Sequence, residues 1–186
     1  SYNSAVLAKE LYEEEKREAK ETATKKIAVI DSLSASSGEL NMALYIQELC
    51  EEGLDFEAVV EKVQAFCGHM QTYFVLESLD TLRKNGRLSG LQAFFATALN
   101  IKPVMGADKG VIIKLDQARG MNRAMIKMVE QVIAKTPDSA EKVLAISHCN
   151  CPARAQVLKE AFEERMKLAK IVVLDTAGVS SMYAND

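Results

Sequence analysis

The stretch "DSLSASSGE", Asp31–Glu39, follows directly after the apolar run "KKIAVI" at residues 25–30. The β-branched character of residues 27–30 is typical of a short strand buried on both faces. The apolar spacing at 40–49 predicts a helix that begins near Gly38. A strand, a polar loop and a helix in this order are typical of α/β proteins, which bind ligands at the carboxyl edges of their strands. The stretch therefore predicts an α/β fold with a ligand site at this loop.

Four serines in this stretch decide which ligand it favours. Serine hydroxyls donate hydrogen bonds without adding net charge, and a helix N-terminus offers free backbone N–H groups and a partial positive charge. Together they favour an anionic headgroup, either a carboxylate or a phosphate. A purely structural interpretation stays open, because Ser36 and Glu39 have the spacing of a capping box.

Composition excludes several classes of function. The chain has 186 residues, is 48% hydrophobic and carries a formal net charge of -3, so it does not attract nucleic acid over long range. It shows neither an apolar run long enough for stable membrane insertion nor a signal peptide, so we expect a cytoplasmic location with four reduced cysteines. The segment "HCNC", residues 148–151, lacks a second matching pair of metal ligands, which favours a strand end before Pro152 over a zinc site.

The residues also argue against an enzyme. Serine hydrolysis needs a histidine base, and the only histidines are His69 and His148, neither accompanied by a G-x-S-x-G elbow. No phosphate-binding P-loop is present. Two alternatives remain: a serine-dependent acyl hydrolase or transferase, and a protein-interaction module that docks through "LRKNGR" and "RGMNR" and carries its ligand only as a structural filler.

Apolar periodicity predicts further elements along the chain. We expect helices at 2–21, 40–49, 56–67, 91–100, 121–133 and 153–166, and strands at 72–76, 142–147 and 171–174. From Ile101 the pattern changes to two strands joined by a glycine-containing turn. We therefore predict the remainder of an amino-terminal α/β domain at 1–100 and a carboxyl-terminal α/β domain at 101–186. Parallel pairing is expected in the first domain and a mixed sheet in the second.

Five segments together resemble the motifs of one known family. They are "SYNSA" at 1–5, "VIDSLSASSG" at 29–38, "LDTLRKNGRLSG" at 79–90, "LNIKPVM" at 99–105 and "ARGMNRA" at 118–124. In their order and spacing they resemble the DegV family of bacterial fatty-acid-binding proteins. The resemblance spans nearly the whole chain, and it implies that family members carry further residues before this point and a short strand segment after it.

The resemblance implies a two-domain protein that holds one long-chain fatty acid as its ligand, with no other cofactor. The carboxylate would bind hydroxyls of the amino-terminal domain, and the acyl tail would enter the apolar interior of the carboxyl-terminal one. A carboxylate among apolar groups must be hydrogen-bonded, or its pKa rises until it is neutral. The expected carboxylate ligands are Ser1, Ser34, Ser36, Ser37 and Gly38, with Ser36 the first choice.

The resemblance further implies a separate ATP-dependent fatty acid kinase as partner, which makes acyl-phosphate for phospholipid synthesis. Arg119 lies where the family has an arginine linked to the kinase, and Arg87 lies in another signature motif, so both are expected to dock the kinase.

The acyl chain gains roughly 0.8 kcal/mol for each buried CH2 group, which requires an apolar lining. The expected lining residues are Phe94, Phe95, Ile101, Val104, Met105 and Ile112.

One departure from the family concerns its carboxyl-terminal histidine. Many members have a His-x-Gly-Pro-Gly motif whose histidine helps at the carboxylate, whereas this chain reads "TAGVSSMYAND" in that region. Thr176 or the pair Ser180 and Ser181 could take the place of the histidine.

Overall fold

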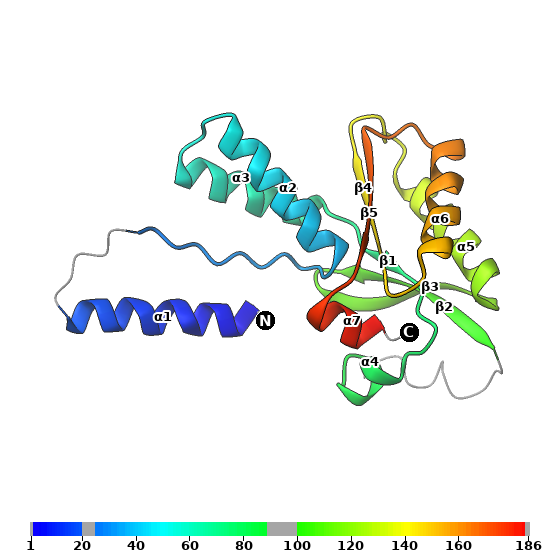
Figure 1. Ribbon diagram of the computed structural model, residues 1–186, viewed down its shortest axis with the longest axis horizontal. Helices are drawn as coiled ribbons and strands as arrows, with labels where there is room; N and C mark the ends of the chain where they lie inside the picture. Colours follow the sequence, from blue (N-terminus) through cyan, green and yellow to red (C-terminus); the bar gives the residue numbers. More distant parts are fainter. Residues whose placement is uncertain (1, 20–24, 89–99, 185–186) are drawn as a thin grey trace. The chain divides into compact units, whose positions relative to one another are not determined.

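The computed structural model describes residues 2–19, 25–88 and 100–184, and every structural statement below concerns these residues (Figure 1). The elements in chain order are α1 (Tyr2–Glu18), α2 (Ser37–Glu51), α3 (Phe56–His69), β1 (Tyr73–Phe74), α4 (Asp80–Lys84), β2 (Ile101–Asp108), β3 (Val111–Arg119), α5 (Met121–Lys135), β4 (Val143–His148), α6 (Pro152–Arg165), β5 (Lys170–Asp175) and α7 (Gly178–Ala184). Helices alternate with antiparallel and parallel strands, so the predicted mixed α/β class is confirmed.

The chain divides into two compact units, which are described separately. The first unit comprises Ser1–Ser32 and Met42–Met70, and the second comprises Leu33–Asn41 and Gln71–Asp186. The serine-rich segment therefore belongs to the second unit, together with the first turn of α2. The domains predicted at 1–100 and 101–186 follow another division of the chain and stay a prediction.

The first unit has a small core between α2 and α3. Leu49, Val63 and Cys67 are buried there, and half-buried apolar side chains from the two helices and from the segments next to them pack around this core. Asp55 caps α3, because its side-chain oxygen accepts a hydrogen bond from the backbone N–H of Ala58 at 2.9 Å. The first unit thus supplies a stable pair of helices.

Two expectations for the first unit differ from the structure. Residues 27–30 are extended, but no described strand pairs with them, so the predicted strand does not form. A strand exists only where a second backbone supplies its hydrogen bonds, and an apolar run by itself does not supply that partner. Apolar side chains along one side of α1, among them Val6 and Leu11, predict that the start of this helix packs against other elements. No described side chain of α1 is buried, however, and Leu7 and Leu11 are more than half exposed.

The second unit contains an antiparallel sheet in the order β1-β2-β3. Strands β2 and β3 form the predicted hairpin, and its turn residues Lys109 and Gly110 have φ values of 49° and 79°. Positive φ at both positions is what a two-residue hairpin turn of type I′ requires, and glycine adopts it without strain. The predicted strand at 72–76 is shortened to β1, which pairs antiparallel with β2.

A separate two-stranded sheet pairs β4 with β5 in parallel. The parallel pairing expected in the first part of the chain is therefore found at 143–175 instead. Helix α6 packs on this sheet and on α5, and side chains of α5, α6 and β4 share an apolar core (Figure 1). The fully packed members of that core are Val129, Val132, Ile146, Ala155 and Phe162.

Helix α5 holds the two sheets of the second unit together. Its residues Ala124 and Met128 pack against Val104 and Ala118 of the antiparallel sheet, whereas Val129 and Val132 belong to the core around the parallel pair. The opposite face of the antiparallel sheet packs on another cluster, in which Leu82, Leu88 and Met105 are buried. The predicted helix at 91–100 lies outside the described residues.

Candidate functional site

The serine loop, defined here as residues 33–37, has a strained backbone. Leu33 and Ser36 have φ values of 52° and 54°, in the left-handed region that non-glycine residues rarely adopt. An N-cap serine usually has an extended backbone, so Ser36 does not have the geometry of the capping box that its spacing suggested. Such strain persists only where surrounding contacts hold it, and it gathers at ligand sites.

Two hydroxyl pairs tie the serine loop to the two sheets of the second unit. The Oγ of Ser34 lies 2.7 Å from Oγ1 of Thr72, the residue just before β1. The Oγ of Ser36 lies 2.8 Å from Oγ of Ser147, near the end of β4. All four residues are half-buried. The loop is therefore held at two positions by neutral hydroxyls, each of which can donate or accept a hydrogen bond.

The hydroxyl that meets Ser36 lies at the carboxyl end of a parallel strand pair, and this pair is β4 and β5 instead of the predicted strand at 27–30. Ser147 is the last residue but one of β4, and the backbone N–H of Thr176, just after β5, donates to the carbonyl of His148 at 2.7 Å. Thr176 Oγ1 in turn lies 2.9 Å from Oγ of Ser181. Hydroxyls thus gather at the strand ends where α/β proteins bind ligands.

His148 is not placed to activate a serine of the loop. Adjacent residues of a strand point to opposite faces, so the ring of His148 points away from the side on which Ser147 meets Ser36. The Nδ1 atom of His148 lies 3.0 Å from Oδ1 of Asp175, although the two groups are not aligned for a hydrogen bond. The arrangement does not match the serine–histidine pair of a hydrolase.

Two of the other expected carboxylate ligands, Ser37 and Gly38, lie at the start of α2. Ser37 opens α2 and is half-buried, and Gly38 behind it is buried, with its N–H bonded to the carbonyl of Ala35 at 3.1 Å. Ser1 lies outside the described residues. Sequence reasoning missed Thr72 and Ser147, although both are hydroxyl residues at strand ends, a position that could have drawn attention to them.

The predicted acyl lining falls into two separate groups. Met105 and Ile112 lie in one cluster, with Leu82, Leu88 and half-buried Tyr183. Val104 packs on the opposite face of the sheet, against α5, as ordinary core. Ile101 is half-buried at the start of β2, and Phe94 and Phe95 lie outside the described residues.

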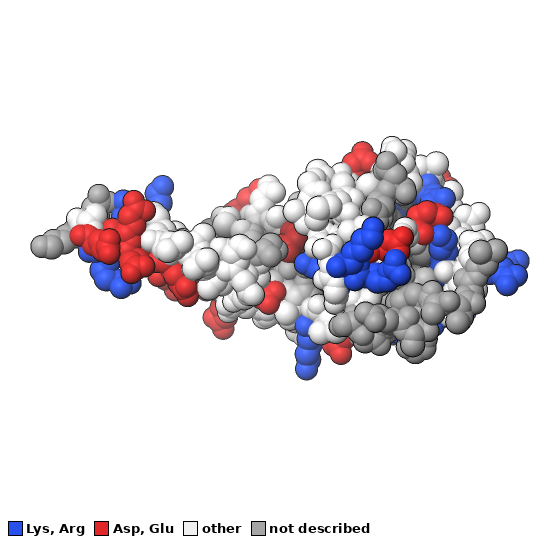
Figure 2. All heavy atoms as spheres, turned by 90° about the horizontal axis from the view of Figure 1, so that it is seen from below, with Lys and Arg blue, Asp and Glu red and all other residues white. Residues whose placement is uncertain are grey.

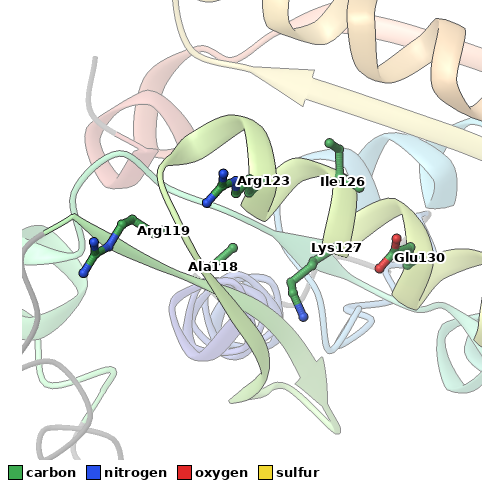
Figure 3. A pocket seen from close by; sticks show the side chains of 6 residues that line it. All are labelled: Ala118, Arg119, Arg123, Ile126, Lys127 and Glu130. Carbon is green, nitrogen blue, oxygen red and sulfur yellow. The ribbon is translucent and has the colours of Figure 1, made fainter.

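A second feature is an open pocket between β3 and α5, here named the α5 pocket (Figure 3). Its lining residues are Ala118, Arg119, Arg123, Ile126, Lys127 and Glu130. Arg119 ends β3, whereas Arg123 and Lys127 follow one another at helical spacing along α5. Both arginines and Ile126 are exposed, so the pocket offers cations beside an apolar side chain.

The cations of the second unit differ in how far they are neutralised. Lys127 Nζ lies 2.8 Å from Oδ2 of Asp116, and this hydrogen bond is the main cause that lowers the pKa of Asp116 and raises the pKa of Lys127. Arg87 instead lies over the ring of Tyr183, with its guanidinium carbon 4.6 Å from the ring centre. On the face shown in Figure 2, basic and acidic groups lie beside one another. This face therefore offers small cationic sites rather than one basic field.

Metal binding and membrane spanning find no support in the described part of the chain. Its His, Cys, Asp and Glu side chains form no group of three or more that could hold a metal ion. Among residues 2–19, 25–88 and 100–184, no helix combines the length and the apolar character needed to cross a bilayer.

Comparison with known proteins identifies the family. Residues 1–185 match the family model described as "Uncharacterised protein, DegV family". The chain belongs to the DegV family. A DegV domain-containing protein of Streptococcus pneumoniae is 35% identical over all of this chain, and one of Streptococcus pyogenes is 36% identical. The chain spans 64% of the length of both relatives.

Solved structures of DegV proteins share the fold. A protein of Ruminococcus gnavus, refined with vaccenic acid, is 48% identical with a TM-score of 0.91, covering 100% of this chain and 64% of its own. The Fatty Acid Kinase (Fak) B3 protein of Streptococcus pneumoniae, loaded with linoleic acid, is 32% identical with a TM-score of 0.82 and the same coverage. A protein of Eubacterium eligens with heptadecanoic acid is 27% identical with a TM-score of 0.82, covering 99% of this chain and 64% of its own.

Proposed function

We propose that this protein binds one long-chain fatty acid and presents its carboxylate to a separate ATP-dependent kinase, which forms the acyl-phosphate. The observation that carries the proposal is the set of neutral hydroxyls on the serine loop, where Ser34 is paired with Thr72 just before β1 and Ser36 with Ser147 near the carboxyl end of β4. Support also comes from DegV proteins whose structures contain fatty acids. The protein would act as a carrier in the cytoplasm, with the acid as its ligand and no further cofactor.

Neutral donors suit a carboxylate that must later react. A fixed cation would neutralise the headgroup and hold it tightly, whereas hydroxyls and a helix N-terminus satisfy its oxygens without adding a full charge. The headgroup would stay ionised, because hydrogen bonds to the charged form offset the cost of removing it from water. We therefore assign Ser34, Ser36 and Ser37 to the headgroup, together with Ser1. Gly38 was expected to join them, but its N–H, the only donor it has, already bonds the carbonyl of Ala35, so its proposed part is to shape the turn beside the headgroup.

The acyl tail needs an apolar path that begins near these hydroxyls. We propose that it runs along the cluster that contains Met105 and Ile112, because this cluster includes a flexible methionine beside several half-buried apolar side chains. Phe94, Phe95 and Ile101 are proposed to complete the lining, whereas Val104 contributes to the core beneath it.

The kinase is proposed to contact the α5 pocket and the exposed Arg87. Arg119 and Arg123 offer two guanidinium groups beside exposed Ile126, an arrangement that fits an acidic surface with an apolar neighbour. Such rim charges act mainly on the rate of association and on salt dependence.

Fatty acid binding is tested first, by native mass spectrometry of the purified protein and by titration with palmitate. We expect a co-purified acid and saturable binding. The substitution Ser36→Ala should weaken palmitate binding about tenfold, the loss of roughly one hydrogen bond to a charged group. The matched control is Ser139→Ala, which removes a hydroxyl that donates to the carbonyl of Lys167 at 2.8 Å in another loop. Absence of any bound or binding acid would refute the proposal.

Kinase presentation is tested separately, with the fatty acid already bound. Arg119→Glu should lower the rate of acyl-phosphate formation at limiting carrier concentration, while the affinity for palmitate stays unchanged. Arg165→Glu, a charge reversal in the last turn of α6, is the control and should leave the rate as it is. Equal rates for both variants would remove the docking role of Arg119 without affecting the binding function.

A further inference from the structure

The two hydroxyl pairs of the site have a common construction. In each pair, one hydroxyl belongs to the strained serine loop and the other belongs to a residue fixed by a sheet. Ser147 lies within the ladder of β4 and β5, where it is paired in register with Leu174. Thr72 is held by its carbonyl, which accepts a hydrogen bond from the N–H of Ala107 in β2 at 3.2 Å. The sheet residues are therefore the rigid members of the pairs.

The direction of the protons follows from the chemistry of the ligand. A hydroxyl has one proton to donate, and an ionised carboxylate only accepts hydrogen bonds. If the proton of Ser36 goes to a carboxylate, the contact with Ser147 at 2.8 Å must be one in which Ser147 donates. The same reasoning makes Thr72 the donor to Ser34. A hydroxyl that accepts one hydrogen bond becomes a stronger donor in the next, because bonds in a chain polarise one another.

We propose that Ser147 and Thr72 are positioning residues for the headgroup: each donates its hydroxyl proton to a loop serine and so directs the proton of that serine at the carboxylate. This inference rests on the proposed function and adds two residues to it that do not touch the ligand. It also explains the left-handed backbone of Ser36, since the contact with Ser147 is the side-chain bond that holds this residue to the sheet. Sites of this kind need supporting groups on rigid elements.

The test compares two probes with the same tail, palmitic acid and hexadecan-1-ol, which lacks the carboxylate. Dissociation constants are measured for the wild type, Ser147→Ala, Thr72→Val and the control Ser139→Ala. We expect Ser147→Ala and Thr72→Val each to weaken palmitate binding about five- to tenfold, the size of one hydrogen bond. Hexadecanol binding should change less than twofold in every variant. A merely structural role would weaken both probes alike.

Two further variants keep the test decisive. Thr72→Ser retains the hydroxyl and should restore palmitate binding, which Thr72→Val with nearly the same shape does not. In the Ser36→Ala background, Ser147→Ala should add no further loss, because the serine that it orients is absent. If the acid and the alcohol weaken equally, or if the two losses add, the positioning role is overturned while the binding function stands. If the wild type binds neither probe, both fall together.

Discussion

The serine loop and the α5 pocket belong to the same unit but differ in charge and in exposure to water. In the serine loop, half-buried neutral hydroxyls are paired at 2.7 Å and 2.8 Å with residues fixed by a sheet. In the α5 pocket, charged side chains are exposed, and one of its cations is already paired with Asp116. The hydroxyls of the serine loop are therefore held in fixed positions, whereas the charges of the α5 pocket interact with their surroundings through water.

This difference predicts how each region responds to change. Hydrogen bonds among half-buried groups depend on distances of a few tenths of an ångström, so the loop should be sensitive to packing and insensitive to salt. Exposed charges are screened by salt and tolerate small shifts, so the pocket should behave in the opposite way. The following experiments test this contrast.

The largest effect is expected from Gly106→Ala, which disturbs the support of the serine loop. A Cβ at this position would lie 2.8 Å from Cδ1 of Leu115 and 3.2 Å from the carbonyl oxygen of Thr72. Leucine can move its side-chain end, but the backbone of Thr72 has to shift. Overpacking of this kind costs about 1 to 3 kcal/mol of the free energy of unfolding, which urea denaturation measures. Palmitate binding should weaken as well, because the hydroxyl of Thr72 is the hydrogen-bond partner of Ser34 and would move with this backbone.

The matched control for this experiment is Gly68→Ala. Gly68 lies in α3, and a Cβ there would meet no atom within 4 Å. Alanine in a helix is more favourable than glycine by roughly 0.5–1 kcal/mol, so this variant should gain stability and leave palmitate binding unchanged. A loss of binding in both variants would show that the loss in Gly106→Ala does not come from the position of Thr72.

The sequence predicted the local parts of this molecule and missed those that depend on distant pairing. The hairpin followed from two apolar runs around Lys109 and Gly110, and β4, α6 and β5 followed from their own periodicity. The strand at 27–30 failed because its pairing depends on another part of the chain. Helix α7 was not predicted, because a glycine at its first position, Gly178, is typical of a turn after a strand.

The candidate site shows the same limit. The loop serines were visible in one short stretch, but the partner of Ser36 lies 111 residues away and that of Ser34 lies 38 residues away. No local pattern links residues at such separations. The separation of Val104 from Met105 could have been foreseen, because adjacent strand residues point to opposite faces.

A smaller effect, seen only in acid, is expected from the ion pair of Lys102 and Glu77. Lys102 is a cation paired with a carboxylate, which distinguishes it from the exposed arginines of the α5 pocket. Lys102 Nζ lies 3.1 Å from the carboxylate of Glu77, and this hydrogen bond is the main cause that lowers the pKa of Glu77 below 4.5. A carboxyl group with a lowered pKa stabilises the fold fully above its unfolded value and loses that contribution as pH falls through the folded value. Acid should therefore remove the contribution only below about pH 4.5.

The measurement is the melting temperature of the wild type and of Glu77→Gln between neutral pH and pH 3. The wild type should be slightly more stable at neutral pH, and the difference should shrink as the pH falls below 4.5. Arg154 also contacts this carboxylate, at 3.1 Å, so Arg154→Gln should lower the same difference in part. A constant difference across the whole range would mean that Lys102 does not hold Glu77 ionised.

The smallest effect on stability is expected from Asp116→Asn, which changes the charge of the α5 pocket without changing its shape. This substitution leaves Lys127 without its carboxylate and adds one positive charge to the lining. The affinity for the kinase should rise at low ionic strength and return to the wild-type value at high salt, because exposed charges are screened within about 8 Å at physiological salt. Palmitate affinity and the urea midpoint should stay nearly unchanged.

The control variant Lys127→Met should shift kinase affinity in the opposite direction, because it removes the same cation. If Asp116→Asn instead altered palmitate binding at every salt concentration, the pocket would be coupled to the serine loop, and the division of labour between a neutral ligand site and a cationic partner site would not hold.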